Sequence, residues 1–154
     1  MDLTGGMGVD FAALSQRFEQ SVYVEQDQDL CHIARHNFSV LGLQGISVVN
    51  DPGEAFLQRM EPAEMICLDP SRRDNVGRKV VRIEECSPDV SVIREQLLAK
   101  AKLVVIKFSP MLDISLALKS LGRVSEVHVV SVENECKELL FLLSPDAMAT
   151  LFHA

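Results

Sequence analysis

The feature that most constrains the fold is a glycine cluster at the start of the sequence, within the segment DLTGGMGVDF. Gly5, Gly6 and Gly8 lie close together, and an apolar spacing typical of a helix follows directly. Glycines let the backbone turn tightly and approach a ligand closely, and the start of a helix presents N–H groups that have no partner within the helix. We therefore expect a strand, a glycine turn and a helix that together face a ligand.

Apolar runs of strand length alternate with segments of helical spacing along the rest of the chain. Alternating strands and helices predict a doubly wound parallel sheet. The expected fold class is α/β, a Rossmann-like, mostly parallel seven-stranded sheet whose first strand is clipped. Only residues 133–137 separate the last two strands, too few for a helix, so the sheet should end in an antiparallel hairpin. The six strands expected after the glycine turn are 21–25, 46–50, 65–69, 103–108, 124–132 and 138–143.

Length and composition favour one globular domain. The 154 residues suffice for a single core, which we place in residues 1–144, with residues 145–154 as a tail or a linker to an absent domain. Because only residues 1–4 precede the glycine turn, we expect a piece of a longer protein, or a chain that lacks upstream residues. The sequence contains no apolar run of the ~20 residues that a membrane helix needs. Four widely spaced cysteines suggest reduced thiols in the cytoplasm.

The acidic residues after the next two strands narrow the choice of ligand. The dinucleotide fingerprint G-x-G-x-x-G fails, because Phe11 stands where the third glycine would follow Gly6, so a nicotinamide dehydrogenase is the least favoured reading. Glu25 ends its strand, where a carboxylate can accept hydrogen bonds from both ribose hydroxyls, and Asp51 could meet an adenine amine. We expect an adenosyl ligand without a diphosphate. The alternative is a bare turn capped by Asp10, with Glu25 merely exposed.

These motifs resemble class I S-adenosylmethionine-dependent methyltransferases. The resemblance runs through DLTGGMGVD, YVEQD, VVNDP, CLDPSRRD and the final hairpin, and it covers essentially the whole chain. CLDPSRRD with the later IKFSPMLD is similar to bacterial methyltransferase-like proteins that carry a THUMP-like domain associated with RNA. The resemblance implies that the methionine end of the cofactor lies over residues 5–8, its ribose on Glu25 and its adenine near Asp51. The implied cofactor-binding residues are Asp2, Thr4, Gly5, Gly6, Met7, Gly8, Asp10, Glu25, Gln26, Asp51, Pro52 and Asp69.

The DPS motif after the fourth strand is the candidate catalytic centre, formed by Asp69, Pro70 and Ser71. In the amino-methylating branch of the family, an Asp or Asn side chain and a proline carbonyl accept hydrogen bonds from the target amine. Ser71 replaces a second proline, and Arg72 stands where an aromatic residue often stacks on a base, although arginine can also stack. Methylation of a pyrimidine C5 usually needs a cysteine nucleophile, and residues 107–110 (KFSP) lack one where related enzymes carry it.

A basic cluster follows the DPS motif in a chain whose formal net charge is −7. That charge argues against unspecific nucleic-acid binding by the whole domain, whereas a local cluster beside the catalytic motif fits RNA phosphates. The alternative is a solvated loop that pairs with Glu84 and Glu85, and Lys107 could equally contact substrate or pair with Asp113. The expected substrate-binding residues are Arg72, Arg73, Arg78, Lys79 and Lys107.

No metal site is expected, because His32 and His36 lack a third ligand in the sequence. His128 lies in an apolar strand, where we expect a histidine whose hydrogen bonds are made within the sheet. We therefore expect a cytoplasmic S-adenosylmethionine-dependent N-methyltransferase acting on an RNA base of tRNA or rRNA, without membrane association. Two alternatives stay open. One is an inactive cofactor-binding or scaffolding module, and the other is a methyltransferase acting on protein or a small molecule. The methylated atom, the oligomeric state and activity of the chain alone are not fixed by these motifs.

Overall fold

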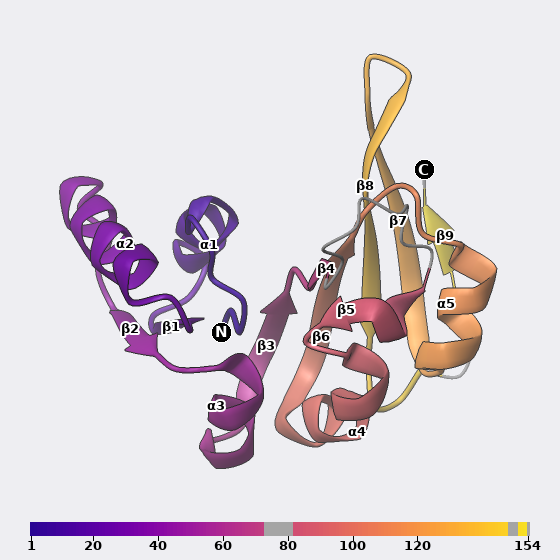
Figure 1. Ribbon diagram of the computed structural model, residues 1–154, viewed down its shortest axis with the longest axis horizontal. Helices are drawn as coiled ribbons and strands as arrows, with labels where there is room; N and C mark the ends of the chain where they lie inside the picture. The colour runs from indigo at the N-terminus through magenta and orange to yellow at the C-terminus, as the bar shows by residue number, and fades with distance from the viewer. Residues whose placement is uncertain (73–81, 148–150, 154) are drawn as a thin grey trace. The chain divides into compact units, whose positions relative to one another are not determined.

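The computed structural model describes residues 1–72, 82–147 and 151–153. The chain divides into two compact units, residues 1–60 and 61–154 (Figure 1), and each is described by itself. Both units are built from strands and helices that alternate over most of their length, as the sequence predicts for an α/β fold. None of the helices in the described parts of the chain is long and apolar enough to cross a membrane.

The first unit is a small parallel α/β layer. Strands β1 and β2 pair in parallel with Ser21 opposite Ile46, and Asp2 forms a further parallel bridge to Tyr23. The predicted strands 21–25 and 46–50 are both confirmed with their boundaries. The elements in chain order are α1 (Val9–Ser15), β1 (Ser21–Glu25), α2 (Gln28–Val40), β2 (Ile46–Asn50) and α3 (Gly53–Arg59).

An aromatic cluster forms the core of the first unit. Phe11, Tyr23 and Phe38 are all buried, and their ring centroids lie 5.2–5.5 Å apart. Helix α2 buries Cys31, Ala34 and Phe38, a spacing that places all three on one face of the helix. Phe11 of α1, Tyr23 of β1 and Phe38 of α2 therefore tie these three elements together.

The second unit is a five-stranded sheet with helices α4 and α5. Its strand order is β3-β6-β8-β7-β9: β3–β6 and β7–β9 are parallel, whereas β6–β8 and β7–β8 are antiparallel. Strands β4 and β5 form a separate antiparallel pair. The elements are β3 (Ala63–Leu68), β4 (Ser71–Arg72), the short 3-10 helix η1 (Ile83–Glu85), β5 (Cys86–Ser87), α4 (Val90–Lys100), β6 (Ala101–Phe108), α5 (Ile114–Leu121), β7 (Val124–Val132), β8 (Glu135–Leu143) and β9 (Leu151–His153).

The predicted antiparallel hairpin is confirmed as β7–β8. Glu133 and Asn134 join the strands, and both have the positive φ angles (53° and 61°) that a two-residue type I′ turn requires. Strand β8 begins at Glu135 rather than at 138, because so tight a turn leaves no further residues in a loop. The hairpin extends from the sheet as a long twisted ribbon (Figure 1).

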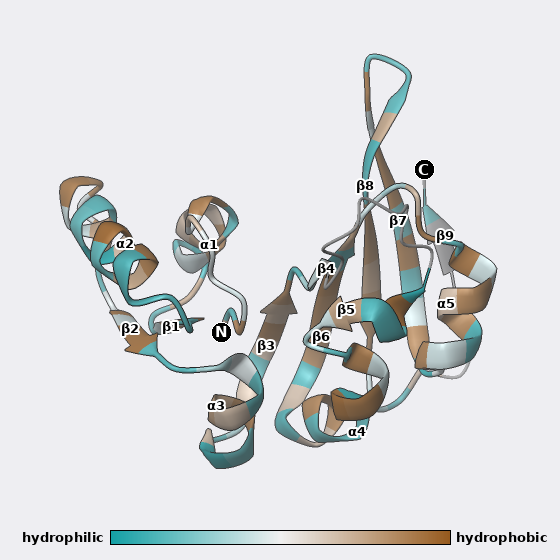
Figure 2. Ribbon diagram, viewed as in Figure 1, coloured by the Kyte–Doolittle hydropathy of each residue, from teal (hydrophilic) through white to brown (hydrophobic). Residues whose placement is uncertain are grey.

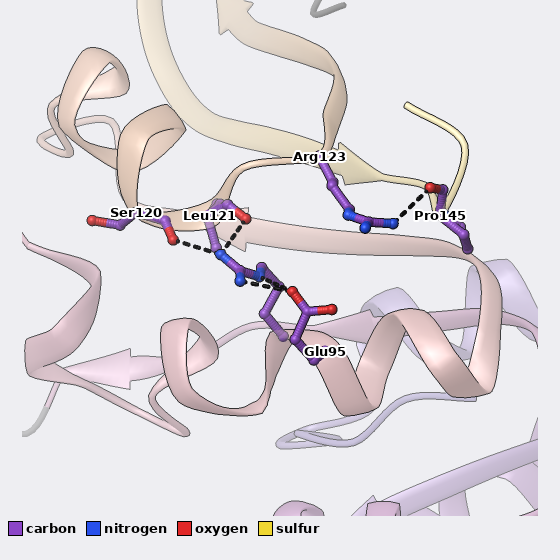
Figure 3. Close-up of polar contacts among 6 residues, drawn as sticks. Glu95, Ser120, Leu121, Arg123 and Pro145 are labelled. Carbon is purple, nitrogen blue, oxygen red and sulfur yellow. Dashed lines mark hydrogen bonds and ion pairs between the residues drawn. The ribbon is translucent and has the colours of Figure 1, made fainter. Parts of the chain in front are cut away.

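The helices of the second unit cover an apolar sheet and are tied to each other. Hydrophobic residues run along β6 and β8 (Figure 2), where Val104, Ile106 and Phe141 are fully buried. From α4, Arg94 donates Nη1 hydrogen bonds to the carbonyl oxygens of Ser120 and Leu121 (3.1 and 3.0 Å) at the end of α5 (Figure 3). These bonds satisfy carbonyl groups that the end of a helix leaves without partners.

Three features differ from the sequence prediction. The expected single seven-stranded sheet is found instead as a two-stranded ladder in residues 1–60 and a five-stranded sheet in residues 61–154. The expected first strand contributes only the Asp2 bridge, because the glycine turn begins within three residues of it. Helices α3 and α4 and strand β9 were not predicted, and β9 shows that residues 151–153 of the expected tail pair with β7.

Candidate functional site

The glycine loop of residues 5–8 is shaped by rings that lie directly beneath it. A Cβ atom on Gly5 would lie 2.2 Å from Cε2 of Tyr23, and one on Gly8 would lie 2.8 Å from Cζ of Phe38. Gly6 and Gly8 also have positive φ angles of 52° and 75°, a region that other residues rarely adopt. Packing and backbone conformation therefore both require glycines here, and α1 begins directly after Gly8.

Glu25 faces the glycine loop from the end of β1. Its Oε2 accepts a hydrogen bond from the Gly6 N–H (2.8 Å), and its Oε1 accepts one from the Asp27 N–H (2.9 Å). The Asn50 side chain donates from Nδ2 to the carbonyl oxygens of Glu25 and Gln26, both at 2.9 Å. The carboxylate predicted to hold a ribose is thus fixed by backbone contacts at the end of β1.

Two buried groups beside this carboxylate stay protonated. Tyr23 donates its hydroxyl hydrogen bond to the Gly6 carbonyl, and burial, with the Glu25 charge adding to it, raises the Tyr23 pKa well above its ordinary value. Burial likewise raises the pKa of the Cys31 thiol, which donates to the Glu25 carbonyl at 3.3 Å. Both groups therefore act as neutral donors that hold the loop and the strand end together.

The other residues of the first unit predicted to bind the cofactor form hydrogen bonds and an ion pair within that unit, or are exposed. The buried Asp2 accepts hydrogen bonds at Oδ1 from the Thr4 N–H (3.0 Å) and more weakly from the Thr4 hydroxyl (3.5 Å). Asp51 forms an ion pair with Arg59 of α3, and its N–H donates to the Glu25 carbonyl at 3.1 Å. Pro52 stands at the start of α3, whereas Met7, Asp10 and Gln26 are exposed.

In the second unit, a pocket of about 300 Å³ lies at the ends of β3 and β6. All three predicted catalytic residues line it: Asp69 and Pro70 follow β3 directly, and Ser71 begins β4. The remaining lining comes from β5, the end of β6, the following turn and β8. These residues are Cys86, Lys107, Phe108, Ser109, Leu112, Lys137 and Glu138.

An ion pair joins two of the predicted site residues in this pocket. Lys107 Nζ lies 2.8 Å from Asp69 Oδ2 and 3.9 Å from Glu138 Oε2. The parallel register explains this pair, because Leu68 and Ile106 are partners in β3 and β6 and the next residues are Asp69 and Lys107. The expected alternative partner, Asp113, instead caps α5 by accepting from the Leu116 N–H. The pairing of Lys107 with Asp113 is therefore corrected to pairing with Asp69.

Three pocket residues were given no role in the site by the sequence analysis. Phe108 supplies an aromatic ring to the pocket and packs edge-to-face on Phe141, with centroids 5.5 Å apart. Glu138 and Lys137 reach the pocket from β8 through the antiparallel β6–β8 register, in which Phe108 lies opposite Leu139. Only the pairing of distant strands brings them here, so no local sequence pattern marks them.

Most of the predicted basic cluster lies outside the described residues, namely Arg73, Arg78 and Lys79. The backbone of Arg72 is described and pairs with Cys86 in the β4–β5 ladder. Glu84, one of the acids offered as an alternative partner, accepts a hydrogen bond from the Ser120 hydroxyl at 2.9 Å. His32 and His36 are both exposed on α2, as expected for a surface pair.

Comparisons with known proteins point to methyltransferases. No family model matches the chain. An uncharacterized S-adenosylmethionine-dependent methyltransferase of Mycobacterium tuberculosis is 26% identical over 137 residues, which are 89% of this chain and 36% of that protein. A solved structure from Porphyromonas gingivalis W83, named as a candidate methyltransferase, superposes with a TM-score of 0.84 at 34% identity, covering 94% of this chain and 36% of that one.

More distant solved structures share the fold. A candidate methyltransferase from Streptococcus mutans in complex with S-adenosylhomocysteine has a TM-score of 0.65 at 11% identity, with coverage of 93% of this chain and 85% of that one. An rRNA methylase from Streptococcus thermophilus has a TM-score of 0.63 at 16% identity, with the same coverage. The chain thus has the fold of class I S-adenosylmethionine-dependent methyltransferases. It spans about a third of the length of the more similar M. tuberculosis and P. gingivalis proteins.

Proposed function

We propose that this chain carries the S-adenosylmethionine-binding and acceptor-binding elements of a methyltransferase that methylates an amino group of an RNA base, in tRNA or rRNA. The observation that carries the proposal is the Glu25 carboxylate, which ends β1 and bonds to the Gly6 N–H of the glycine loop at 2.8 Å. A carboxylate in that place can accept both ribose hydroxyls of an adenosyl group. The name of the M. tuberculosis relative supports the same cofactor.

The loop suits S-adenosylmethionine better than a dinucleotide. In the dinucleotide fingerprint, the third glycine lets the helix approach the strand closely enough for a pyrophosphate to sit on its N-terminus. Phe11 occupies that position and packs its buried ring 5.5 Å from that of Tyr23. A side chain at this position prevents the close helix–strand packing of the dinucleotide fingerprint, which an adenosyl ligand without a diphosphate does not require.

In the second unit, Asp69 and the carbonyl of Pro70 would accept hydrogen bonds from the target amine. An exocyclic amine is a poor nucleophile while its lone pair is delocalised into the base, and two fixed acceptors redirect that lone pair toward the methyl donor. The nitrogen–methyl bond then forms as the sulfur–methyl bond breaks, which leaves S-adenosylhomocysteine and a proton that passes to water. Lys107 would orient Asp69, and Phe108 would offer its ring to the base.

An RNA substrate is supported by charge and position. Arg72, Arg73, Arg78 and Lys79 follow Asp69 closely in the sequence, and Lys137 adds a cation to the pocket lining. Such clusters contact phosphates, and phosphate contacts release counterions, so binding becomes steeply dependent on salt. One solved structure of the same fold is named as an rRNA methylase.

A second candidate is an inactive cofactor-binding module that serves as a scaffold. The Lys107–Asp69 ion pair favours it, because Asp69 already has a charged partner at 2.8 Å and a target amine would have to share the carboxylate. This candidate keeps cofactor binding and lacks methyl transfer. The two candidates therefore differ in turnover and agree in affinity.

Calorimetric titration of this chain with S-adenosylhomocysteine, with NADH as the control ligand, tests the cofactor. We expect binding of the first ligand alone, and binding of NADH alone would overturn the proposal. Transfer of labelled methyl groups from S-adenosylmethionine to tRNA and rRNA, measured over a series of salt concentrations, tests the acceptor. Incorporation that falls steeply with salt supports the RNA proposal, whereas cofactor binding without incorporation into any RNA supports the scaffold.

A further inference from the structure

A cluster of metal-ligating side chains lies on strands β7 and β9 of the second unit, among residues that do not line its pocket. Glu126 and His128 are two residues apart on β7, so their side chains share one face of the sheet. His153 of β9 is the direct register partner of His128 across the parallel β7–β9 pair. The register therefore places a carboxylate and two imidazoles side by side on one face of the second unit.

The two imidazoles approach the same carboxylate oxygen of Glu126. Nε2 of His128 lies 2.9 Å from Glu126 Oε2, and Nε2 of His153 lies 3.3 Å from the same oxygen. The two imidazole rings stack with their centroids 4.6 Å apart and their planes 17° apart. All three candidate ligand atoms lie within 4.8 Å of one another, and each side chain is at least partly exposed to solvent.

The two nitrogen–oxygen separations match the spacing of neighbouring ligands around a single divalent ion. With ligand bonds of about 2.1 Å and angles between octahedral and tetrahedral values, neighbouring nitrogen and oxygen ligands lie about 3.0–3.4 Å apart. Two histidines and one carboxylate form a ligand set that zinc accepts, with water completing the coordination. On the other side of β7, the partners of Glu126 and His128 in β8 are Leu142 and Leu140, so that strand supplies no further polar side chain at these positions.

We propose that Glu126, His128 and His153 form a zinc site that fastens strand β9 to β7. Strand β9 is only three residues long, and among the described strands it pairs only with β7, so few backbone hydrogen bonds hold it. A zinc ion ligated from both strands ties them together through side chains as well. The ion acts on the fold of the second unit and does not depend on the proposed methyl transfer.

The test uses this chain in a His32→Ala/His36→Ala background, which removes the exposed histidine pair of α2 as a competing ligand pair. Zinc affinity is measured by competition with a chromophoric chelator, and amide hydrogen exchange of residues 151–153 is followed with and without zinc. We expect one zinc ion per chain and slower exchange in β9 when zinc is bound. His128→Ala and His153→Ala should each weaken binding by about 100-fold or more, since even removal of outer-shell partners costs up to about that much.

Two conservative changes keep the outcome decisive if an alanine variant is poorly folded. Glu126→Gln retains the shape and polarity of the side chain but removes the ligating charge, so it should also weaken zinc binding. Glu135→Gln, an exposed acid at the tip of the same hairpin, serves as the matched control and should leave affinity unchanged. Native affinity in both the Glu126 and His128 variants, or zinc binding that leaves β9 exchange unchanged, would overturn the proposal.

Discussion

The two units of the chain hold their key carboxylates in different ways. In the first unit, Glu25 is bonded to two backbone N–H groups, those of Gly6 and Asp27. In the second, Asp69 is paired with the side chain of Lys107, which also lies 3.9 Å from Glu138. One carboxylate is therefore positioned by the backbone and the other by neighbouring side chains.

The surroundings of the two carboxylates differ in the same way. The glycine loop leaves no space for a Cβ at Gly5 or Gly8, because the rings of Tyr23 and Phe38 lie against it. The pocket of the second unit is lined in part by charged residues, among them Lys107 and Lys137. A rigid site built from the backbone, as around Glu25, suits a cofactor that is the same in every turnover. The Asp69–Lys107 ion pair, in contrast, can exchange partners when an acceptor base enters the pocket.

Asp69→Ala should have the largest effect on turnover. Loss of one positioned polar group at a reacting centre typically costs about 10²–10³-fold in kcat, so we expect transfer to fall by that factor. Affinity for S-adenosylhomocysteine should stay unchanged, because the carboxylate is proposed to hold the acceptor. Single-turnover methyl transfer and calorimetry on the same preparation measure the two effects. Asp69→Asn, which keeps an acceptor oxygen, should retain more activity, and a joint loss of binding and transfer would show that Asp69 serves the cofactor.

Glu25→Gln should show the reverse pattern. Hydrogen bonds to a charged group contribute about 1.5–3 kcal/mol, so S-adenosylhomocysteine should bind roughly 10- to 150-fold more weakly. The folded chain should remain intact, since an amide oxygen can still accept from the Gly6 N–H. Glu19→Gln, an exposed acid of the same unit, is the control and should not change affinity. Equal affinities in the wild type and the Glu25 variant would contradict the ribose assignment.

Gly5→Ala tests the rigidity of the first unit. The added Cβ would lie 2.2 Å from the Tyr23 ring, so the ring or the loop must move, at a cost of about 2–3 kcal/mol in the free energy of unfolding. Gly42→Ala is the matched control, because its φ is 68° and no atom lies within 4 Å of the added Cβ. That variant should lose only about 1–2 kcal/mol, the cost of a left-handed residue. Urea denaturation of both variants measures the difference, and equal losses would argue against a packed loop.

The fold was more predictable from the sequence than the site. The segments 21–25, 46–50 and 124–132 are strands with those boundaries, because each is rich in the β-branched residues that strands favour. Helix α4 was missed since Val90, Val92 and Ile93 crowd its start and obscure the helical spacing, although Val92 is exposed. Asp69 and Glu25 could be proposed from the sequence because each ends a predicted strand, a position visible in the sequence.

Contacts set by the register of distant strands could not be predicted in this way. Lys107 meets Asp69 through the β3–β6 pairing, and Glu138 reaches the same pocket through the β6–β8 pairing. The His128–His153 pair depends on β9, whose three residues carry no strand signal of useful length. A single sequence contains each of these residues but not the alignment of one strand against another.

Lys107→Met should have the smallest effect on stability and decides what the ion pair does. The pair is partly exposed, with the Lys107 side chain 26% and the Asp69 side chain 55% accessible, so its loss should cost no more than about 1 kcal/mol. If Lys107 orients Asp69, kcat should fall while the KM for RNA stays constant. If it contacts a phosphate instead, KM should rise and the slope of log affinity against log salt should decrease by about one.

The control for this variant is Lys102→Met, which breaks the more exposed ion pair with Glu64 in the same sheet. It should change neither kcat nor KM, because Lys102 and Glu64 do not line the pocket. A Lys107 variant that behaves like this control would mean that the ion pair serves neither orientation nor binding. A gain in kcat would show that Lys107 competes with the acceptor amine for Asp69. The ion pair would then limit the access of the acceptor to Asp69, whereas the backbone contacts of Glu25 hold that carboxylate ready for the cofactor.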